Sequence, residues 1–229
     1  MRSILIVNAK GGCGKTTLAT NLASNYALQG HAVVMADFDP QGSTMEWIAA
    51  RPADRPPIVG YAAWREAVRA MQRPDYLIMD APAGVSGREL TRLVRNCDTV
   101  LVPVLPSPID IRAAARFMRE LLLNIQVAQH PVKISMVANR VRENTVVFQK
   151  LQRFLRSLDI PFLTTLRETQ HYIRAAQTGL GIFDMVPSTV ATDLAQWHPL
   201  LEWIETGQQR SAARIAVGNR SHSVTRESQ

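Results

Sequence analysis

The stretch Lys10-Gly-Gly-Cys-Gly-Lys-Thr-Thr17 decides the fold of this 229-residue chain. It directly follows an apolar run in residues 2–8 that favours a strand, and residues 16–29 are compatible with a helix. Between a strand and a helix, backbone N–H groups and the helix N-terminus can face one phosphate group. The alternative is an ordinary glycine turn before a helix, which the strand and helix on either side disfavour.

The residue types in this loop match the parts of a nucleoside triphosphate. The glycines let N–H groups turn inward, and the Lys15 ammonium is expected at the β- and γ-phosphates. Thr16 offers a hydroxyl oxygen to Mg²⁺, and Thr17 can hydrogen-bond the α-phosphate. The residues predicted to bind nucleotide in this loop are Gly11, Gly12, Cys13, Gly14, Lys15, Thr16 and Thr17.

Further apolar runs of strand length recur along the chain, each separated by room for a helix. They lie at 32–36, 76–79, 99–103, 133–138 and 162–166. Helices are predicted at 61–71, 87–96, 109–125, 147–158, 170–178 and 191–205. Since the strand runs are continuously apolar, both faces of the sheet are expected to be covered. The sequence predicts a doubly wound α/β fold with a mostly parallel sheet, one domain over 1–207, and a basic, flexible tail over 208–229.

Acidic residues follow two of the predicted strands. In Asp37-Phe-Asp-Pro-Gln-Gly-Ser43, two carboxylates at i and i+2 on an extended segment point to the same side, where they could face a metal ion and a water. Asp80 ends an apolar run at the carboxyl edge of the sheet, where open α/β sheets bind ligands. Thr16, Asp39 and Asp80 are therefore the predicted metal site, with Asp80 acting through water.

The loop K-G-G-x-G-K-T-T resembles that of the deviant Walker-A ATPases of the ParA/MinD superfamily. Asp37–Ser43 is similar to the D-x-D-P-Q-G switch of the ParA family, and Pro103-Val-Leu-Pro-Ser-Pro-Ile-Asp110 resembles the proline-rich loop of small ParF-type partition ATPases. The resemblance extends to about residue 205. Because the P-loop begins at Lys10, we expect no helix-turn-helix domain before it and no operator-specific DNA binding.

The resemblance implies roles for further residues. Lys10 would reach across a nucleotide-sandwich dimer to the partner's ATP, and Asp39 would orient the attacking water. With Lys15, these two residues form the expected catalytic set. Asn139 resembles the family's adenine-reading position, although a lone Asn at a strand end is more often a cap. Pro106 lies in the loop that approaches the nucleotide and the dimer seam.

The resemblance also implies partners. ATP and Mg²⁺ would close a homodimer that binds DNA non-specifically, and a separately encoded adaptor protein would stimulate its slow hydrolysis. Such a cycle positions a plasmid, a chromosome region or a protein organelle such as a carboxysome. The expected location is the cytoplasm, in association with the nucleoid.

Charge alone leaves the partner open. The formal net charge is +7, and Lys150, Arg153 and Arg156 share one side of a predicted helix. Other candidates for a phosphate-binding patch are Arg140, Arg142, Arg167, Arg174 and the arginines of the tail. The alternative is a solvated basic surface, and the family resemblance rather than the charge favours DNA.

Two other functions are disfavoured. A MinD-like protein would end in an amphipathic membrane helix, whereas residues 210–218 offer only Ile215 and Val217 as sizeable apolar groups, and no apolar run could span a bilayer. An iron–sulfur relative would need cysteines beyond the P-loop, and only Cys97 is present besides Cys13. Two cysteines also give no disulfide framework or zinc motif.

Overall fold

The structure is a computed structural model that describes residues 1–65, 73–126, 128 and 130–206. Its centre is a seven-stranded sheet in the order β3-β2-β4-β1-β5-β6-β7, with every neighbouring pair parallel. The strands are β1 (Arg2–Ile6), β2 (Val33–Asp37), β3 (Val59–Ala62), β4 (Tyr76–Asp80), β5 (Thr99–Val104), β6 (Lys133–Val141) and β7 (Phe162–Arg167). The predicted parallel α/β sheet is confirmed.

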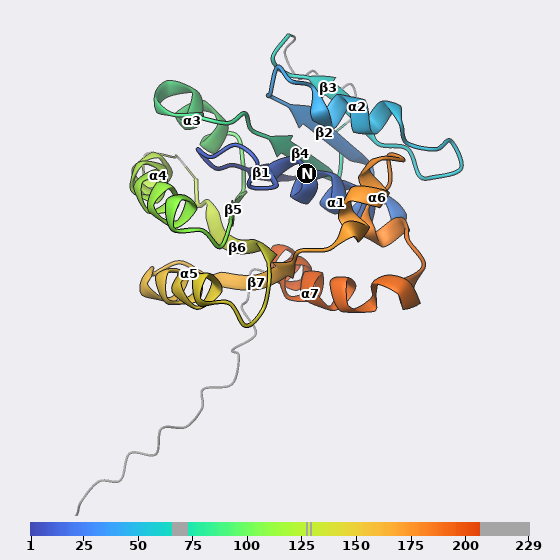
Figure 1. The fold of residues 1–229 in the computed structure, drawn as a ribbon. Helices are drawn as coiled ribbons and strands as arrows, with labels where there is room; N and C mark the ends of the chain where they lie inside the picture. The colour runs from blue at the N-terminus through green and yellow to red at the C-terminus, as the bar shows by residue number, and fades with distance from the viewer. Residues whose placement is uncertain (66–72, 127, 129, 207–229) are drawn as a thin grey trace, which may run out of the picture.

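Helices cover both faces of the sheet (Figure 1). One face carries α3 (Gly87–Val94), α4 (Pro108–Gln126) and α5 (Val146–Ser157). The other carries α1 (Lys15–Leu28), α2 (Ser43–Ala49), α6 (Gln170–Ala176), the 3-10 turn η1 (Ile182–Asp184) and α7 (Pro187–Thr206). This is the doubly wound arrangement that the strand runs predict.

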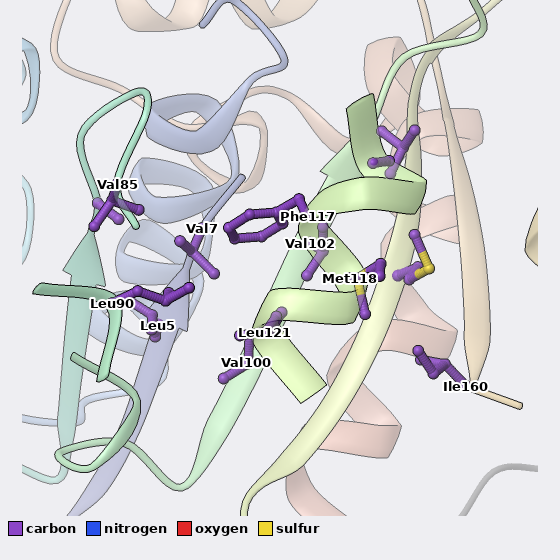
Figure 2. Packing of buried hydrophobic residues seen from close by; sticks show 14 of the residues in the cluster. Leu5, Val7, Val85, Leu90, Val100, Val102, Phe117, Met118, Leu121 and Ile160 are labelled. Carbon is purple, nitrogen blue, oxygen red and sulfur yellow. The ribbon is translucent and has the colours of Figure 1, made fainter. Parts of the chain in front are cut away.

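Each face of the sheet has its own hydrophobic cluster. Leu5 of β1 packs in the cluster beneath α3, α4 and α5, together with Phe117 and Leu121 (Figure 2). Its neighbours Ile4 and Ile6 point to the opposite face, into the cluster beneath α1 and α7. Successive strand side chains alternate between faces, so a strand covered on both sides reads as a continuous apolar run.

The sequence prediction was wrong between β2 and β4. The helix expected from residue 61 is replaced at its start by β3, which pairs with β2 from Val34↔Val59 to Asp37↔Ala62, and residues 66–71 of that prediction lie outside the described chain. Pairing with an existing edge strand outweighs weak local helix preference. Helix α2, which follows Gly42, was not predicted at all.

The end of α7 is tied to the beginning of the chain. Glu205 accepts hydrogen bonds from Arg2 and from the Tyr76 hydroxyl, the latter at 2.7 Å. Trp197 and Trp203 of this helix are buried, as expected for a helix packed on its own core. Helix α7 begins at Pro187, earlier than the predicted residue 191, and the predicted tail over 208–229 lies outside the described residues.

Candidate nucleotide site

The P-loop connects β1 to α1 at the carboxyl edge of the sheet, and it is closely packed against β6. Gly14 has a φ of 95°, and a Cβ there would lie 2.0 Å from Asn139 Nδ2. Asn139 itself donates from Nδ2 to the carbonyl of Cys13 at 2.8 Å. Gly14 is therefore required by both backbone conformation and space, and Asn139 supports the loop from the end of its strand.

The two P-loop lysines lie close together but differ in their contacts. Lys15 is buried, and its ammonium donates to the carbonyl of Lys10 at 3.2 Å. The Lys10 backbone N–H is held by Asn8 Oδ1 at 3.2 Å, and Asn8 donates to the Pro103 carbonyl at 2.6 Å. Within the described chain, the Lys10 ammonium has no hydrogen-bond or ion-pair partner, so it is available to a ligand outside its own fold.

Cys13 faces into the P-loop rather than into solvent. Its thiol donates to the Lys10 carbonyl at 3.3 Å, and burial raises its pKa above the ordinary value in spite of the nearby Lys15. Cys97 is buried in the core, where burial raises its pKa to about 12. Neither thiol is an activated nucleophile in this environment.

Asp80 is the buried acid of the site. Its Oδ2 accepts hydrogen bonds from the hydroxyls of Thr16, at 2.7 Å, and Thr44, at 2.9 Å, while Oδ1 has no partner among the described residues. Burial raises the pKa of Asp80 to about 6, and the two hydroxyls lower it only partly. The unpartnered Oδ1 gives this buried carboxylate an oxygen that could hold a cation.

Asp37 and Asp39 were predicted to face the same way, but in the structure their carboxylates have different surroundings and contacts. Asp37 is fully buried and accepts backbone N–H groups of Asp39, at 2.9 Å, and Thr44, at 3.1 Å. Burial raises its pKa, and these N–H groups oppose the shift. Asp39 is partly exposed in the loop before α2 and accepts the Gln41 N–H at 3.0 Å. Asp37 thus holds the backbone, and Asp39 is the carboxylate left within reach of solvent.

Two cavities meet at Thr17. One, of about 410 Å³, is also lined by Asn139, Arg167, Glu168, Tyr172 and Gln177. The other, of about 360 Å³, is lined by Thr16, Thr17, Trp47 and Gln177. Pockets for small ligands commonly have about 300–1,000 Å³. The P-loop therefore has open space on both sides of Thr17, one side of which includes the Asn139 predicted to read the base.

The oxygen atoms around Asp80 suit Mg²⁺ better than a softer metal. Thr16 Oγ1 and Asp80 Oδ1 are hard donors, and the phosphate oxygens of a nucleotide would add more. In the described chain, no group of three His, Cys, Asp or Glu side chains is placed to hold a metal by itself. No hydrogen bond joins Asp39 to Asp80 or Thr16, and Pro106 lines neither of the two cavities.

The predicted basic patch is partly neutralised by ion pairs. Arg167 binds the buried Asp193 through Nε at 2.6 Å and Nη2 at 3.0 Å, and Arg142 pairs with Glu168. Burial would raise the pKa of Asp193, but hydrogen bonds from Arg167 and His171 outweigh it and hold that pKa below its usual value. Lys150, Arg153 and Arg156 are exposed on α5 and form no ion pair with a described residue.

A larger basic surface was missed from the sequence. The helix face of α3, α4 and α5 carries nine exposed cations, which we call the basic face: Arg88, Arg92, Arg95, Arg112, Arg116, Arg119, Lys150, Arg153 and Arg156. Within residues 87–95, 108–126 and 146–157, nine positive and three negative side chains leave +6 of the chain's +7. The i, i+4, i+7 spacing on α3 and α4 was a signal that could have revealed it.

The protein belongs to the CobQ/CobB/MinD/ParA nucleotide binding domain family, whose model matches residues 4–182. Maintenance of carboxysome distribution protein A from Halothiobacillus neapolitanus is 29% identical over 190 residues, covering 80% of this chain and 87% of that protein. The chromosome-partitioning ATPase Soj of Thermus thermophilus is 32% identical over 138 residues, covering 45% and 55%. The resemblance to ParA/MinD proteins is thereby confirmed.

Solved structures confirm the fold. Apo McdA from Cyanothece superposes with a TM-score of 0.73 at 13% identity, covering 88% of this chain and 98% of that one. The septum site-determining protein MinD of Pyrococcus horikoshii, complexed with Mg-ADP, gives 0.68 at 17% identity, covering 90% and 96%. Among the residues that the structure describes, no helix combines the length and apolar character needed to cross a bilayer.

Proposed function

We propose that this protein is a ParA-type ATPase that binds ATP and Mg²⁺, closes into a sandwich dimer, binds DNA non-specifically and positions a cargo. The observation that carries the proposal is the P-loop itself, in which Thr16 is bonded to Asp80 and the Lys10 ammonium has no partner in the described chain. The relatives named for carboxysome distribution and chromosome partitioning support a cargo-positioning role. In the cell it would act in the cytoplasm, on the nucleoid.

The residues divide the work of ATP hydrolysis among them. Lys15 would leave the Lys10 carbonyl and bind the β- and γ-phosphates, while the P-loop N–H groups hold the phosphate oxygens. Mg²⁺, held by Thr16 and Asp80, would offset the charge that develops on the phosphates. Asp39 would orient the attacking water, and Lys10 would contact the ATP of the partner protomer. Hydrolysis stays slow without an adaptor, because these residues include no arginine finger.

The basic face is the DNA-binding surface in this proposal. Nine cations without a described ion pair lie on three neighbouring helices, and they would bind phosphates without reading the bases. Dimer formation would bring two such surfaces onto one duplex and raise the affinity through the second surface. Binding would therefore depend on ATP even though the basic face exists in each protomer.

The first test is the oligomeric state in each nucleotide state, measured by light scattering on a size-exclusion column. The wild-type protein should be a monomer without nucleotide or with ADP, and a dimer with ATP and Mg²⁺. Lys15→Ala should lose ATP binding by at least about tenfold and remain a monomer, because the buried ammonium is the cation directed at the phosphates. A Lys15→Ala protein that still dimerised with ATP would contradict the site.

Lys133→Ala is the matched control for that variant. Lys133 is exposed at the start of β6, at the opposite end of the strand from Asn139, so its loss should leave nucleotide binding and dimer formation unchanged.

A stable ATP dimer that binds neither free duplex DNA nor DNA-coated beads would favour the MinD-like alternative. Sedimentation with anionic liposomes would then test membrane binding directly.

A further inference from the structure

Thr44 is a fully buried hydroxyl residue whose side chain reaches Asp80. It is the second residue of α2, and its backbone N–H donates to Asp37 at 3.1 Å while its hydroxyl donates to Asp80 at 2.9 Å. Asp37 and Asp80 are paired across β2 and β4. Thr44 therefore fastens the start of α2 to the ends of two adjacent strands, one through the backbone and one through the side chain.

The hydrogen bond from the Thr44 hydroxyl determines which Asp80 oxygen remains available to a metal ion. Oδ2 accepts from both Thr16 and Thr44, whereas Oδ1 has no partner in the described chain. Two donors on one oxygen hold the buried carboxyl group in this orientation more firmly than Thr16 alone would. Hydrogen bonds to a ligating carboxylate of this kind orient the ligand for the metal.

Thr44 also bounds the loop that contains Asp39. The loop runs from Asp37, at the end of β2, to the N-terminus of α2. The Thr44 N–H donates to Asp37, so this hydrogen bond joins the two ends of the loop. The N-cap residue of α2, Gly42, has no side chain to satisfy the first N–H groups of the helix. Asp37 takes the place of that cap by accepting the Thr44 N–H, and the Thr44 hydroxyl adds a second anchor on Asp80. The position of α2 therefore depends on these two contacts.

We propose that Thr44 is a positioning residue for the Mg²⁺ site. The Thr44 hydroxyl orients Asp80 and joins the metal site to α2. This inference rests on the proposed function, since it concerns the same Mg²⁺ and ATP site. Thr44 touches neither metal nor nucleotide, and its effect passes through Asp80. It follows that the hydroxyl group, rather than the volume of the side chain, is what this position requires.

The test compares Thr44→Val, which keeps the volume, with Thr44→Ser, which keeps the hydroxyl. Binding of a fluorescent ATP analogue is titrated with Mg²⁺ and repeated in EDTA. Thr44→Val should need roughly tenfold more Mg²⁺ at half-saturation, in keeping with the loss of a partner to a metal ligand. Thr44→Ser should stay within about twofold of the wild type. In EDTA, all three proteins should bind equally, because the phosphate contacts of the P-loop are unchanged.

A second readout needs no nucleotide. Amide hydrogen exchange in α2 should be faster in nucleotide-free Thr44→Val than in the wild type or Thr44→Ser, since only the valine variant lacks the bond to Asp80. The control is Thr164→Val, which removes a buried hydroxyl that binds the Gln196 carbonyl on α7. It should leave the Mg²⁺ midpoint and the exchange of α2 unchanged.

Several results would overturn the inference. One is a wild-type Mg²⁺ midpoint in Thr44→Val, and another is a larger defect in Thr44→Ser, which would assign packing to this position. Equal weakening with and without Mg²⁺ would also count against it. If Thr44→Val does not fold, Thr44→Ala against Thr44→Ser gives the same contrast. A wild-type protein whose ATP affinity ignored Mg²⁺ would overturn the proposed site as well, whereas a normal wild type with an unaffected valine variant would overturn the inference alone.

Discussion

At the scale of single residues, the acidic residues of the site have two different roles. One accepts hydrogen bonds from the backbone, and the other remains available for catalysis. Both carboxylate oxygens of Asp37 accept backbone N–H groups, whereas the Asp39 carboxylate is partly exposed and accepts only the N–H of Gln41 among the described contacts. Asp37 is also fully buried, so a water from solvent does not reach its carboxylate. This leaves Asp39 as the acid that can act on the γ-phosphate side.

Replacement of Asp39 should separate ATP binding from hydrolysis. Asp39→Ala should keep the wild-type ATP affinity and lower the turnover by about 10²-fold or more, because a positioned general base typically contributes that much. The ATP dimer should then accumulate, as measured by light scattering beside a phosphate-release assay. Asp54→Ala removes an exposed acid from the loop after α2 and serves as the control. Normal hydrolysis by Asp39→Ala would show that the assignment is wrong.

Asp80 should make the nucleotide-free protein less stable at neutral pH. Its pKa of about 6 lies above the ordinary value of 3.8, so the folded state favours the protonated acid. The stability from that proton is complete below about pH 4 and is lost as the pH rises through about 6. Asp80→Asn should thus raise the free energy of unfolding by about 1–3 kcal/mol at pH 8.

The difference between wild type and Asp80→Asn should shrink when urea unfolding is repeated near pH 4.5. In the same variant, ATP binding should need at least about tenfold more Mg²⁺, because a neutral amide oxygen is a weaker metal partner than the carboxylate. A stability difference that stayed constant between pH 4.5 and 8 would mean that Asp80 does not carry the raised pKa.

The residue scale also shows what a sequence can and cannot predict about a site. Thr16 and Asp80 were both assigned to the metal site because each has a fixed place relative to a strand end, and in the structure the Thr16 hydroxyl donates to Asp80 at 2.7 Å. Thr44 was missed because its role depends on α2, a seven-residue helix that no apolar periodicity announced. The contacts of Asp37 could not be predicted for the same reason, since they lie in the loop before that helix and at its start.

At the scale of helices and strands, the central elements were predictable and the edge was not. The runs that became β1, β4, β5 and β6 are apolar because both sides are buried. Strand β3 has four residues, includes Gly60 and lies at the edge, so its sequence carries little strand signal. Its place is set by hydrogen bonds to β2, which is information that arises only in the folded sheet.

The basic face gives the element-scale prediction for DNA binding. Three variants replace the three cations of α3, α4 or α5 by alanine, and each should weaken duplex binding. Each should also lower the salt slope, by about one unit for every phosphate that the variant no longer binds. The control replaces Arg55, Arg73 and Lys133, none of which lies on these helices. Fluorescence anisotropy with duplexes of unrelated sequence, over a range of salt, gives both quantities.

The outcome also locates the interface. If DNA binding survives removal of all nine cations with an unchanged salt slope, the basic face is a solvated surface, and the DNA site lies elsewhere on the protein. If only the α5 variant is defective, the surface is the narrower one that the sequence indicates. Weaker binding in all three variants would show that the layer of α3, α4 and α5 acts as one surface.

On the scale of the whole molecule, the two sides of the sheet are specialised. The face under α1 and α7 includes the P-loop helix and buries Trp197 and Trp203, and the opposite face carries the nine cations of the basic face. Glu205 at the end of α7 is bonded to Arg2 at the start of β1, whereas the P-loop follows the other end of β1 (Figure 1). The last described helix therefore ends at the edge of the sheet away from the nucleotide site.

The proposed cycle depends on ATP switching the protein onto DNA. The decisive measurement is the affinity of the purified protein for non-specific duplex DNA with ATP and Mg²⁺, with ADP and Mg²⁺, and without nucleotide, at low and raised salt. We predict binding with ATP that is at least about tenfold tighter than in the other two states and that weakens steeply with salt. Equal affinity in all three states would rule out such a switch. So would a protein that forms the ATP dimer but does not bind DNA.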